Sequence, residues 1–179
     1  MDQPLVWVDL EMTGLDPGRH VIVEIAVVVT DAALEEVIEG PDLVVAASDA
    51  DLALMGSVVT EMHTASGLLD EIRRSRVGVG EAEAQVLEFV RRYAPQPHLA
   101  PLAGNSIHAD RAFLRWYMPE LNGWLHYRNV DVSTVKELAR RWYPEAYDSA
   151  PEKAKGHRAL ADIQESIAEL RYYRTAIFK

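Results

Sequence analysis

Apolar and polar residues follow two different patterns along the chain, and the pattern changes near residue 45. Before that point, β-branched and other apolar residues run almost continuously between short polar turns, which predicts strands. The expected strands span residues 4–11, 20–30 and 36–45, the last bent at Gly40-Pro41. Turn-forming residues separate them at Asp16-Pro17-Gly18 and Thr30-Asp31-Ala32. Three successive strands with short connections predict a β-meander.

Beyond residue 45, apolar residues recur mostly every three to four positions, which is the period of an α-helix. After a polar loop at 46–51, short helical pieces are expected between 52 and 75, broken around residues 63–67. Longer helices are expected at 81–93, 109–118, 133–143 (with Ser133 as N-cap) and 158–178, and short strands at 102–104 and 130–132. Irregular connections are expected at 94–101, 120–128 and 145–156. This order predicts a mixed α/β sheet with helices packed on it, in a single domain spanning residues 1–179.

Composition narrows the functional classes. The chain has no cysteine, which excludes disulfides, zinc–thiolate sites and cysteine nucleophiles. It begins without a basic, apolar leader, and the longest apolar stretch, residues 21–29, is interrupted by Glu24, so we expect a cytoplasmic protein with no membrane contact. The net charge of −10 disfavours an extended phosphate-binding groove. A short nucleic acid held largely through metal ions is easier to reconcile with this charge than a long one, and a local basic patch is the open alternative.

The first expected strand carries the most informative pair of polar residues. Asp9 and Glu11 are two positions apart, so their side chains point to the same face of the strand. Two neighbouring carboxylates repel each other unless a cation or a proton lies between them, and Mg²⁺ and Mn²⁺ prefer such oxygen ligands. Chance is the alternative, because the chain has 28 acidic residues. For Glu24 in the next strand, we expect a buried carboxylate satisfied by hydrogen bonds rather than a support for a metal site.

Two further acidic residues and a histidine complete a candidate site. Asp110 is either an ordinary charge in the first turn of a helix or a third metal ligand, and its position leaves both open. His157 and Asp162 would lie about 140° apart on one helix, so they share a site more easily if His157 precedes the helix. Four carboxylates can hold two divalent ions for phosphoryl chemistry, and a histidine can take a proton from water. A serine hydrolase is disfavoured, because G-x-S-x-G after Gly104 requires glycine where His108 stands.

Three stretches resemble the exonuclease motifs of the DEDDh 3′–5′ exonuclease family. They are Asp9–Leu15, Gly104–Ser106 with Asp110-Arg111, and His157–Leu160 with Asp162. Within that family they are most similar to the oligoribonuclease branch, because Met62–Leu68 and Tyr127–Thr134 match stretches particular to it. The similarity covers nearly the whole chain in order and spacing, and the ordered set is far more specific than any one motif.

The resemblance implies an RNase H-like fold and 3′→5′ hydrolysis of RNA only a few nucleotides long, dinucleotides included, to 5′-mononucleotides. It implies that Asp9, Glu11, Asp110 and Asp162 bind two divalent ions, Mg²⁺ or Mn²⁺, and that His157 is the general base. Leu15 would wedge against the bases, and the 5′ phosphate would be held by His63, Ser106 and Arg128. It further implies a homodimer in which Tyr127 reaches the partner's site.

The chain departs from the family pattern at two positions: Val58 stands where an aromatic residue is frequent, and Ala109 where a glutamine is common. Aromatic residues at Trp116, Tyr117, Trp124 and Tyr127 offer an interface, although we expect Trp116 to be a core residue. Two rival functions remain: a DNA-directed proofreading exonuclease with the same catalytic set, and a catalytically silent nucleotide-binding module.

Overall fold

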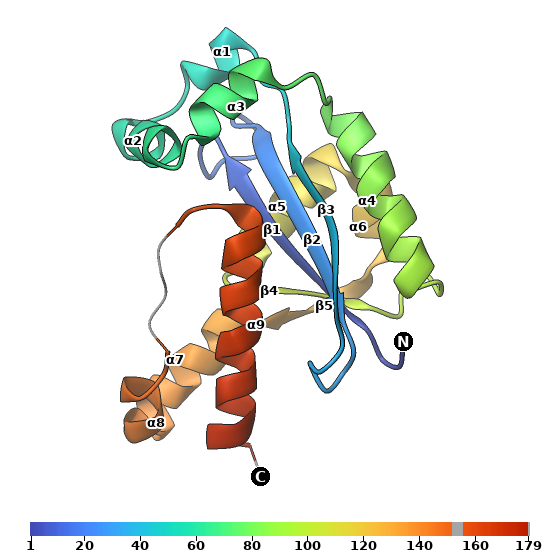
Figure 1. Cartoon of the computed structure of the whole chain (residues 1–179), viewed down its shortest axis with the longest axis vertical. Helices are drawn as coiled ribbons and strands as arrows, with labels where there is room; N and C mark the ends of the chain where they lie inside the picture. Colours follow the sequence, from blue (N-terminus) through green and yellow to red (C-terminus); the bar gives the residue numbers. More distant parts are fainter. Residues whose placement is uncertain (152–155, 179) are drawn as a thin grey trace.

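Five strands form one mixed sheet in the computed structural model, which describes residues 1–151 and 156–178 (Figure 1). The strands are β1 (Leu5–Met12), β2 (Ile22–Thr30), β3 (Val37–Val44), β4 (Pro101–Gly104) and β5 (His126–Asp131). Their order across the sheet is β3-β2-β1-β4-β5. The first three strands pair antiparallel, which confirms the predicted meander, and β4 and β5 add to β1 in parallel.

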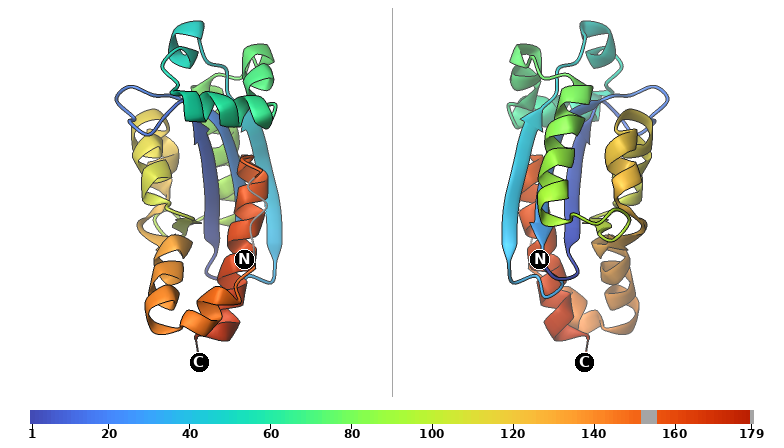
Figure 2. Two further views of the ribbon diagram at one scale, coloured as in Figure 1. Left: turned by 90° about the vertical axis from the view of Figure 1, so that its left-hand side faces the viewer. Right: turned by 90° about the vertical axis from the view of Figure 1, so that its right-hand side faces the viewer.

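Helices cover both faces of the sheet and one of its ends (Figure 2). They are α1 (Asp49–Leu52), α2 (Ser57–Ala65), α3 (Leu68–Arg74), α4 (Val79–Tyr93), α5 (His108–Tyr117), α6 (Pro119–Trp124), α7 (Val132–Trp142), α8 (Pro144–Asp148) and α9 (Ala159–Ala176). Residues of α4, α5 and α6 share a core with one face, and α9 packs on the other face with α7 beside it. The short helices α1 to α3 lie at the end of the sheet toward which β1 points (Figure 1).

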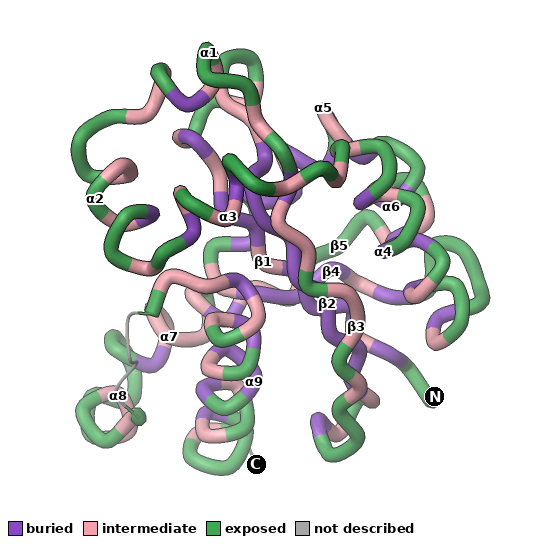
Figure 3. Tube along the Cα trace, turned by 45° about the horizontal axis from the view of Figure 1, so that its top comes forward, coloured by how far each residue is buried: buried purple, intermediate pink, exposed green. Residues whose placement is uncertain are grey.

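Alternation along β1 sorts its side chains between the two faces. Val6, Val8 and Leu10 are buried in the core beneath α4 to α6. Trp7 faces the opposite way and packs with the apolar residues of α9. Asp9 and Glu11 follow Trp7 at every second position of β1, so their side chains point to the same face as Trp7. This confirms that the two carboxylates share a face. All nine residues of β2 are buried, so the centre of the sheet is covered on both sides (Figure 3).

The structure corrects several predicted boundaries. The connection expected at 120–128 contains most of α6 and the first half of β5, and the irregular segment expected at 145–156 begins with α8. Pro119 and Pro144 stand at the first turns of α6 and α8, where proline is favoured because its fixed φ suits the helix. Helix α7 is capped by Asp131 and not by Ser133, since the Asp131 side chain accepts from the backbone N–H of Ser133. The polar loop at 46–51 contains the start of α1.

The expectation that Trp116 is a core residue is wrong. Its side chain is 65% exposed, because the buried stripe of α5 runs through Phe113 and Leu114 and leaves Trp116 on the outer side. Tyr117 and Trp124 instead pack against the core and donate hydrogen bonds to backbone carbonyls. None of the helices in the described ranges has the length and apolar character that a bilayer crossing requires.

Candidate active site

Four carboxylates meet where β1 ends. Asp9 and Glu11 come from β1, Asp110 from the first turn of α5, and Asp162 from the first turn of α9. The backbone N–H of Leu10 donates to Oδ1 of Asp110 at 3.0 Å, which holds this carboxylate against β1. Asp110 is buried in the cluster and is therefore not an ordinary surface charge in the first turn of a helix. Of the two roles that the sequence left open, a metal ligand is the one that this position fits.

Burial and mutual repulsion make these carboxylates hard to ionise. Burial raises the pKa of Asp9 well above its usual range, and the charges of Asp110, Asp162 and Glu11 raise it further. Burial, followed by the charges of Glu24 and Asp162, raises the pKa of Glu11 to about 8. Burial raises the pKa of Asp110 to about 7, against the opposing effect of its backbone hydrogen bonds. Such a cluster is favourable for a cation, which would replace the protons.

His157 joins the cluster from the segment that precedes α9. This agrees with the expectation that His157 and Asp162 share a site more easily when His157 lies before the helix. Ligand atoms of Glu11, His157 and Asp162 all lie within 4.8 Å of one another. The backbone of His157 has φ 49, in the left-handed region that few residues other than glycine adopt. The chain thus brings this imidazole to the carboxylates through an unusual backbone conformation.

His63 approaches the same cluster from α2. The side chain is fully buried, and its Nε2 lies 3.0 Å from the carbonyl of Met12. Because a carbonyl can only accept, Nε2 carries the proton, and burial lowers the pKa of His63 so that the ring is neutral. Nδ1 then holds a lone pair 3.9 Å from Oε2 of Glu11, with no hydrogen-bond partner among the described residues. An unpartnered lone pair beside an acidic cluster fits a site built for a cation.

A small pocket of about 150 Å³ opens beside the acidic cluster. Its walls are formed by Leu10, Glu11, Met12, Gly14, Leu15, Val59, Met62 and His63. Leu15 is 81% exposed, so its apolar side chain is available to a ligand at this pocket. Val58, at the position where the family often has an aromatic residue, is also exposed and directly precedes the pocket residue Val59.

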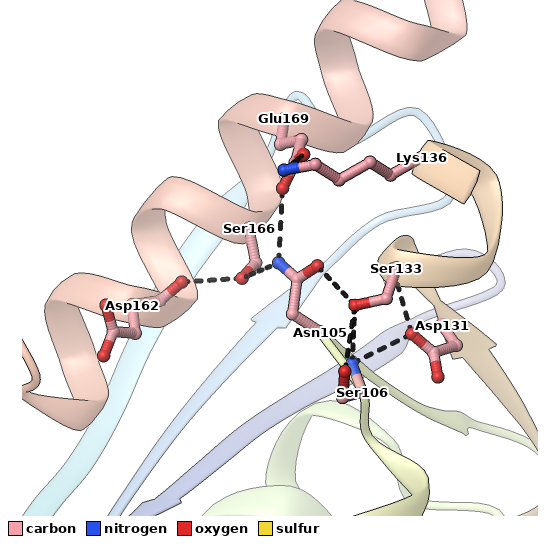
Figure 4. A network of polar contacts seen from close by, with 8 residues as sticks. All are labelled: Asn105, Ser106, Asp131, Ser133, Lys136, Asp162, Ser166 and Glu169. Atoms are coloured by element: carbon pink, nitrogen blue, oxygen red, sulfur yellow. Dashed lines mark hydrogen bonds and ion pairs between the residues drawn. The ribbon is translucent and has the colours of Figure 1, made fainter. Parts of the chain in front are cut away.

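Ser106 lies at the other side of β1, in the turn after β4. Its backbone N–H donates to Oδ1 of Asp131 at 3.0 Å and to Oγ of Ser133 at 2.9 Å (Figure 4). Its own Oγ is 3.2 Å from that of Ser133 and remains exposed to solvent. The hydroxyl is therefore presented by a turn that the start of α7 holds in place.

Asn105 connects this turn to α9. Its Nδ2 donates to Oγ of Ser166 at 2.6 Å, and its Oδ1 accepts from Ser133 at 3.0 Å. Ser166 in turn donates to the backbone carbonyl of Asp162 at 2.7 Å (Figure 4). This chain of contacts fixes the helical turn that carries Asp162 relative to β4 and α7. The sequence motif contains Asn105, but sequence reasoning assigned it no role.

Tyr127 and Arg128 project from β5, the edge strand of the sheet. The Tyr127 ring is 72% exposed and stacks on His126 with centroids 4.5 Å apart. The Arg128 guanidinium lies 5.4 Å from the Tyr127 ring centroid. His63, on α2, has no exposed surface, whereas Ser106 and Arg128 lie on other elements, so joint binding of a 5′ phosphate by the three stays a prediction.

Glu24 is the buried, hydrogen-bonded carboxylate that we expected. Its side chain is fully buried and accepts from Nε of Arg158 at 2.8 Å and from the backbone N–H of Ala159 at 3.2 Å. Terminal nitrogens of Arg158 also donate to both oxygens of Glu71. Sequence reasoning missed this role of Arg158, although a buried glutamate in a central strand is a signal that a cationic partner is needed.

Arg111 is a buried cation to which the sequence assigned no role. Its guanidinium donates to Oδ1 of Asn129 at 2.7 Å and to the carbonyl of His126 at 2.7 Å, both in β5. It also donates to Oδ1 of Asn122 in α6. Arg111 directly follows Asp110, so the residue next to the candidate ligand ties α5 to the strand that carries Tyr127.

Comparisons with known proteins agree with the geometry. A family model described as exonuclease matches residues 6–170. The chain is similar to oligoribonucleases of Corynebacterium glutamicum strain R (60% identity over 99% of this chain and 81% of that protein), Mycobacterium avium strain 104 (54%, 99% and 83%) and Streptomyces avermitilis (56%, 99% and 88%).

Solved structures of exonuclease I share the fold. One covers 98% of this chain and 42% of its own at 17% identity, with a TM-score of 0.73. Exonuclease I from Methylocaldum szegediense covers 98% and 41% at 20% identity, with a TM-score of 0.64. These similarities confirm the mixed, RNase H-like sheet flanked by helices.

Proposed function

The chain belongs to the exonuclease family and, within it, to the oligoribonucleases, and on that premise we propose that it hydrolyses RNA only a few nucleotides long from the 3′ end, releasing 5′-mononucleotides. One observation carries the proposal: four carboxylates and a histidine from three separate segments of the chain meet at the end of β1. A silent binding module is disfavoured, because every catalytic position of the family motif is filled in this chain.

The acidic cluster fits divalent cations. Asp9, Glu11, Asp110 and Asp162 would hold two ions, Mg²⁺ or Mn²⁺, which are hard cations that favour carboxylate oxygens. When bound, such ions supply positive charge at the scissile phosphate and at the attacking and leaving oxygens. The raised pKa values of Glu11 and Asp110 and the unpartnered Nδ1 of His63 support this assignment.

His157 would accept the proton of the attacking water at its imidazole. A histidine titrates near neutrality, so activity should fall at acid pH as the ring becomes protonated. The base assignment can be tested with His157→Ala, which should remove the acid limb of the pH profile and lower kcat. An unchanged acid limb would assign the base to another group and leave His157 as a ligand beside Glu11 and Asp162.

Substrate would lie between the pocket and β5. Leu15 would contact a base at the pocket rim, while His63, Ser106 and Arg128 would bind the 5′ phosphate and so limit the length. We also propose a homodimer in which Tyr127 reaches the partner's site, since its exposed ring projects from an edge strand. The cytoplasmic location expected from the sequence remains a prediction.

The decisive experiment is an end-labelled assay on RNAs of two, five and twenty nucleotides with Mn²⁺, with Asp162→Ala as the inactive control and a DNA dinucleotide alongside. Rapid loss of the RNA dinucleotide, a nearly intact twenty-mer and no cleavage by the variant would support the proposal. Equal rates at all lengths would preserve the chemistry but remove the length-limiting roles of His63, Ser106 and Arg128. Faster cleavage of DNA would favour the proofreading class, and no cleavage at all would favour the binding module.

A further inference from the structure

A single guanidinium joins three elements around the candidate site. Arg158, the residue directly before α9, donates from Nε to Oε1 of Glu24 in β2 at 2.8 Å. Its two terminal nitrogens donate to the two oxygens of Glu71 in α3, at 3.2 and 2.9 Å. Two-point contacts of arginine with a carboxylate restrict orientation as well as distance. The start of α9 is therefore held to both the sheet and α3 by one side chain.

The three joined elements carry or support the proposed catalytic groups. His157 directly precedes Arg158, and Asp162 lies one helical turn beyond it. Glu24 is the cross-strand partner of Glu11 in the β1–β2 register, beside a bulge. Helix α3 follows α2, which supplies a wall of the pocket beside Glu11. A shift at Arg158 would thus move the base relative to the carboxylates.

The backbone of His157, next to Arg158, has a conformation that surrounding contacts must stabilise. His157 has φ 49, and a non-glycine residue remains in this region only where the surrounding contacts fix it. The contacts of the next two residues supply this constraint, because Arg158 binds Glu24 with its side chain and Ala159 donates its backbone N–H to Oε2 of the same glutamate at 3.2 Å. Glu24 is fully buried, and its bond from the Ala159 N–H is buried with it, while its bond from Arg158 is partly buried.

We propose that Arg158 is a positioning residue for the hydrolysis: by binding Glu24 and Glu71 together, it holds His157 in place beside Glu11 and Asp162. This inference rests on the proposed function, because it assigns the orientation of that reaction's base. The contacts of Arg158 with Glu24 and with Glu71 can be removed one at a time by substitution. Glu71 is 42% exposed in its side chain and links α9 to α3, whereas the buried Glu24 links α9 to the sheet.

Kinetics on an RNA dinucleotide with saturating Mn²⁺ test the proposal in the chain of 179 residues. Arg158→Gln should lower kcat by about 10- to 100-fold with KM changed by less than about threefold, because a misplaced base impairs the chemical step more than binding. Arg158→Lys should recover part of the loss, since its ammonium keeps the charge and one donor for Glu24. Glu71→Gln should lower kcat less than Arg158→Gln does, and adding it to Arg158→Gln should cost nothing more.

A matched control exists in α7. Arg140 binds both oxygens of Glu137, at 2.9 and 2.8 Å, in a similar two-point contact on the outer surface. Arg140→Gln should leave kcat and KM at wild-type values. Wild-type kcat in Arg158→Gln, or an equal loss in Arg140→Gln, would overturn the proposal. If Arg158→Gln fails to fold, the other two variants decide: wild-type kcat in both Glu71→Gln and Arg158→Lys would also overturn it.

Hydrogen exchange separates this inference from the proposed function. The amide of Ala159 should exchange at least tenfold faster in Arg158→Gln than in the wild type or in Arg140→Gln, because its bond to Glu24 loses support. This readout needs no activity. If the wild type cleaved no RNA, the proposed function would fail, yet faster exchange would still show that Arg158 holds the segment of His157. Unchanged exchange would overturn the positioning role.

Discussion

At the scale of single residues, burial decides which charges become a site. Glu11 and Asp110 are each less than a tenth exposed, and each is close enough to other carboxylates to repel them. Most acidic residues in the ranges that the structure describes are at least partly exposed and lie outside this cluster. The same sequence feature, a carboxylate two positions from another, therefore has opposite meanings on the surface and at the end of a buried strand.

The pH dependence of stability follows from these carboxylates. In the metal-free protein the pKa of Glu11 is about 8 and that of Asp110 about 7, against ordinary values of 4.5 and 3.8. The folded state holds protons that the unfolded chain releases, so the free energy of unfolding should fall as the pH rises from about 4 to 8. Melting curves in EDTA at pH 5 and pH 8 check this, and equal melting temperatures would contradict it.

Added Mg²⁺ or Mn²⁺ should reverse that loss, because cations bind the deprotonated carboxylates of the folded state. At 100 times Kd the stabilisation is about 2.7 kcal/mol, which should raise the melting temperature by about 5–10 °C at pH 8 for a chain of this size. The increase should be small at pH 5, where protons compete. If Asp9→Asn plus Asp162→Asn abolishes activity but leaves the metal-induced increase unchanged, these residues are not the main ligands.

Val58 allows a gain-of-function test at the pocket. Val58 is exposed and directly precedes the pocket residue Val59 in the sequence. Stacking of a base on an aromatic side chain contributes roughly 1–3 kcal/mol per base. Val58→Trp should therefore lower KM for an RNA dinucleotide about fivefold or more, with kcat little changed. Leu99→Trp, at another exposed apolar residue away from the pocket, is the control and should leave KM unchanged. Equal effects of the two substitutions would show that the pocket does not stack a base at Val58.

At the scale of elements, β1 serves the core and the site with alternate residues. The residues on one face of β1 belong to the core beneath α4 to α6. The other face carries Trp7 in the second core and, further along the strand, the carboxylates of Asp9 and Glu11. The register of β1 against β2 is therefore critical, since a slip by one residue would exchange the two sets. The buried centre of the sheet, with β2 fully covered, enforces this register.

Packing of β3 against α4 offers an element-scale test remote from the site. A Cβ on Gly40 would lie 2.4–2.7 Å from ring atoms of Phe89, so the ring would have to move. Gly40→Ala should cost about 1–3 kcal/mol, lowering the melting temperature by several degrees with kcat unchanged. Gly80 lies in α4, the helix that carries Phe89, and a Cβ there would meet open space. Gly80→Ala should therefore leave the free energy of unfolding equal or slightly higher. Equal melting temperatures for the two variants would refute the close contact.

At the scale of the whole molecule, an acidic chain exposes aromatic residues on several elements, among them α5 and β5. The net charge is −10, and the rings of Trp116 and Tyr127 are 65% and 72% exposed. Tyr127 projects from β5, an edge of the sheet with no neighbouring strand on its far side in the part of the chain that is described. An edge strand with an exposed aromatic residue is suited to contact a second protomer.

Complementation tests whether Tyr127 acts in the partner's site. Tyr127→Ala and Asp162→Ala should each be nearly inactive alone. Mixed dimers would contain one site that combines an intact Asp162 with the partner's Tyr127, so an equal mixture should recover about a quarter of wild-type activity after subunit exchange. No recovery, with mixed dimers demonstrated by differently tagged protomers, would show that Tyr127 acts within its own chain. A monomer by light scattering would refute the dimer itself.

The sequence by itself determined the order of most elements and named the acidic residues that the structure brings together. Runs of β-branched residues predicted the meander, and alternation alone placed Asp9 and Glu11 on one face, because both signals depend on local geometry. The shift from three strands to alternating helices predicted the mixed sheet. Polar segments were harder, as β5 shows: its exposed residues on an edge strand lack the apolar pattern by which strands are recognised.

Only the tertiary structure decided which distant residues meet. The sequence left Asp110 open, and the hydrogen bond from Leu10, one hundred positions away, brings it to β1. It gave no role to Arg158 or Arg111, whose partners lie on other elements. It also misplaced Trp116, because the exposed side of α5 depends on what packs against the helix. Local patterns specify the elements, whereas burial, raised pKa values and ion pairs arise from contacts between segments far apart in the chain.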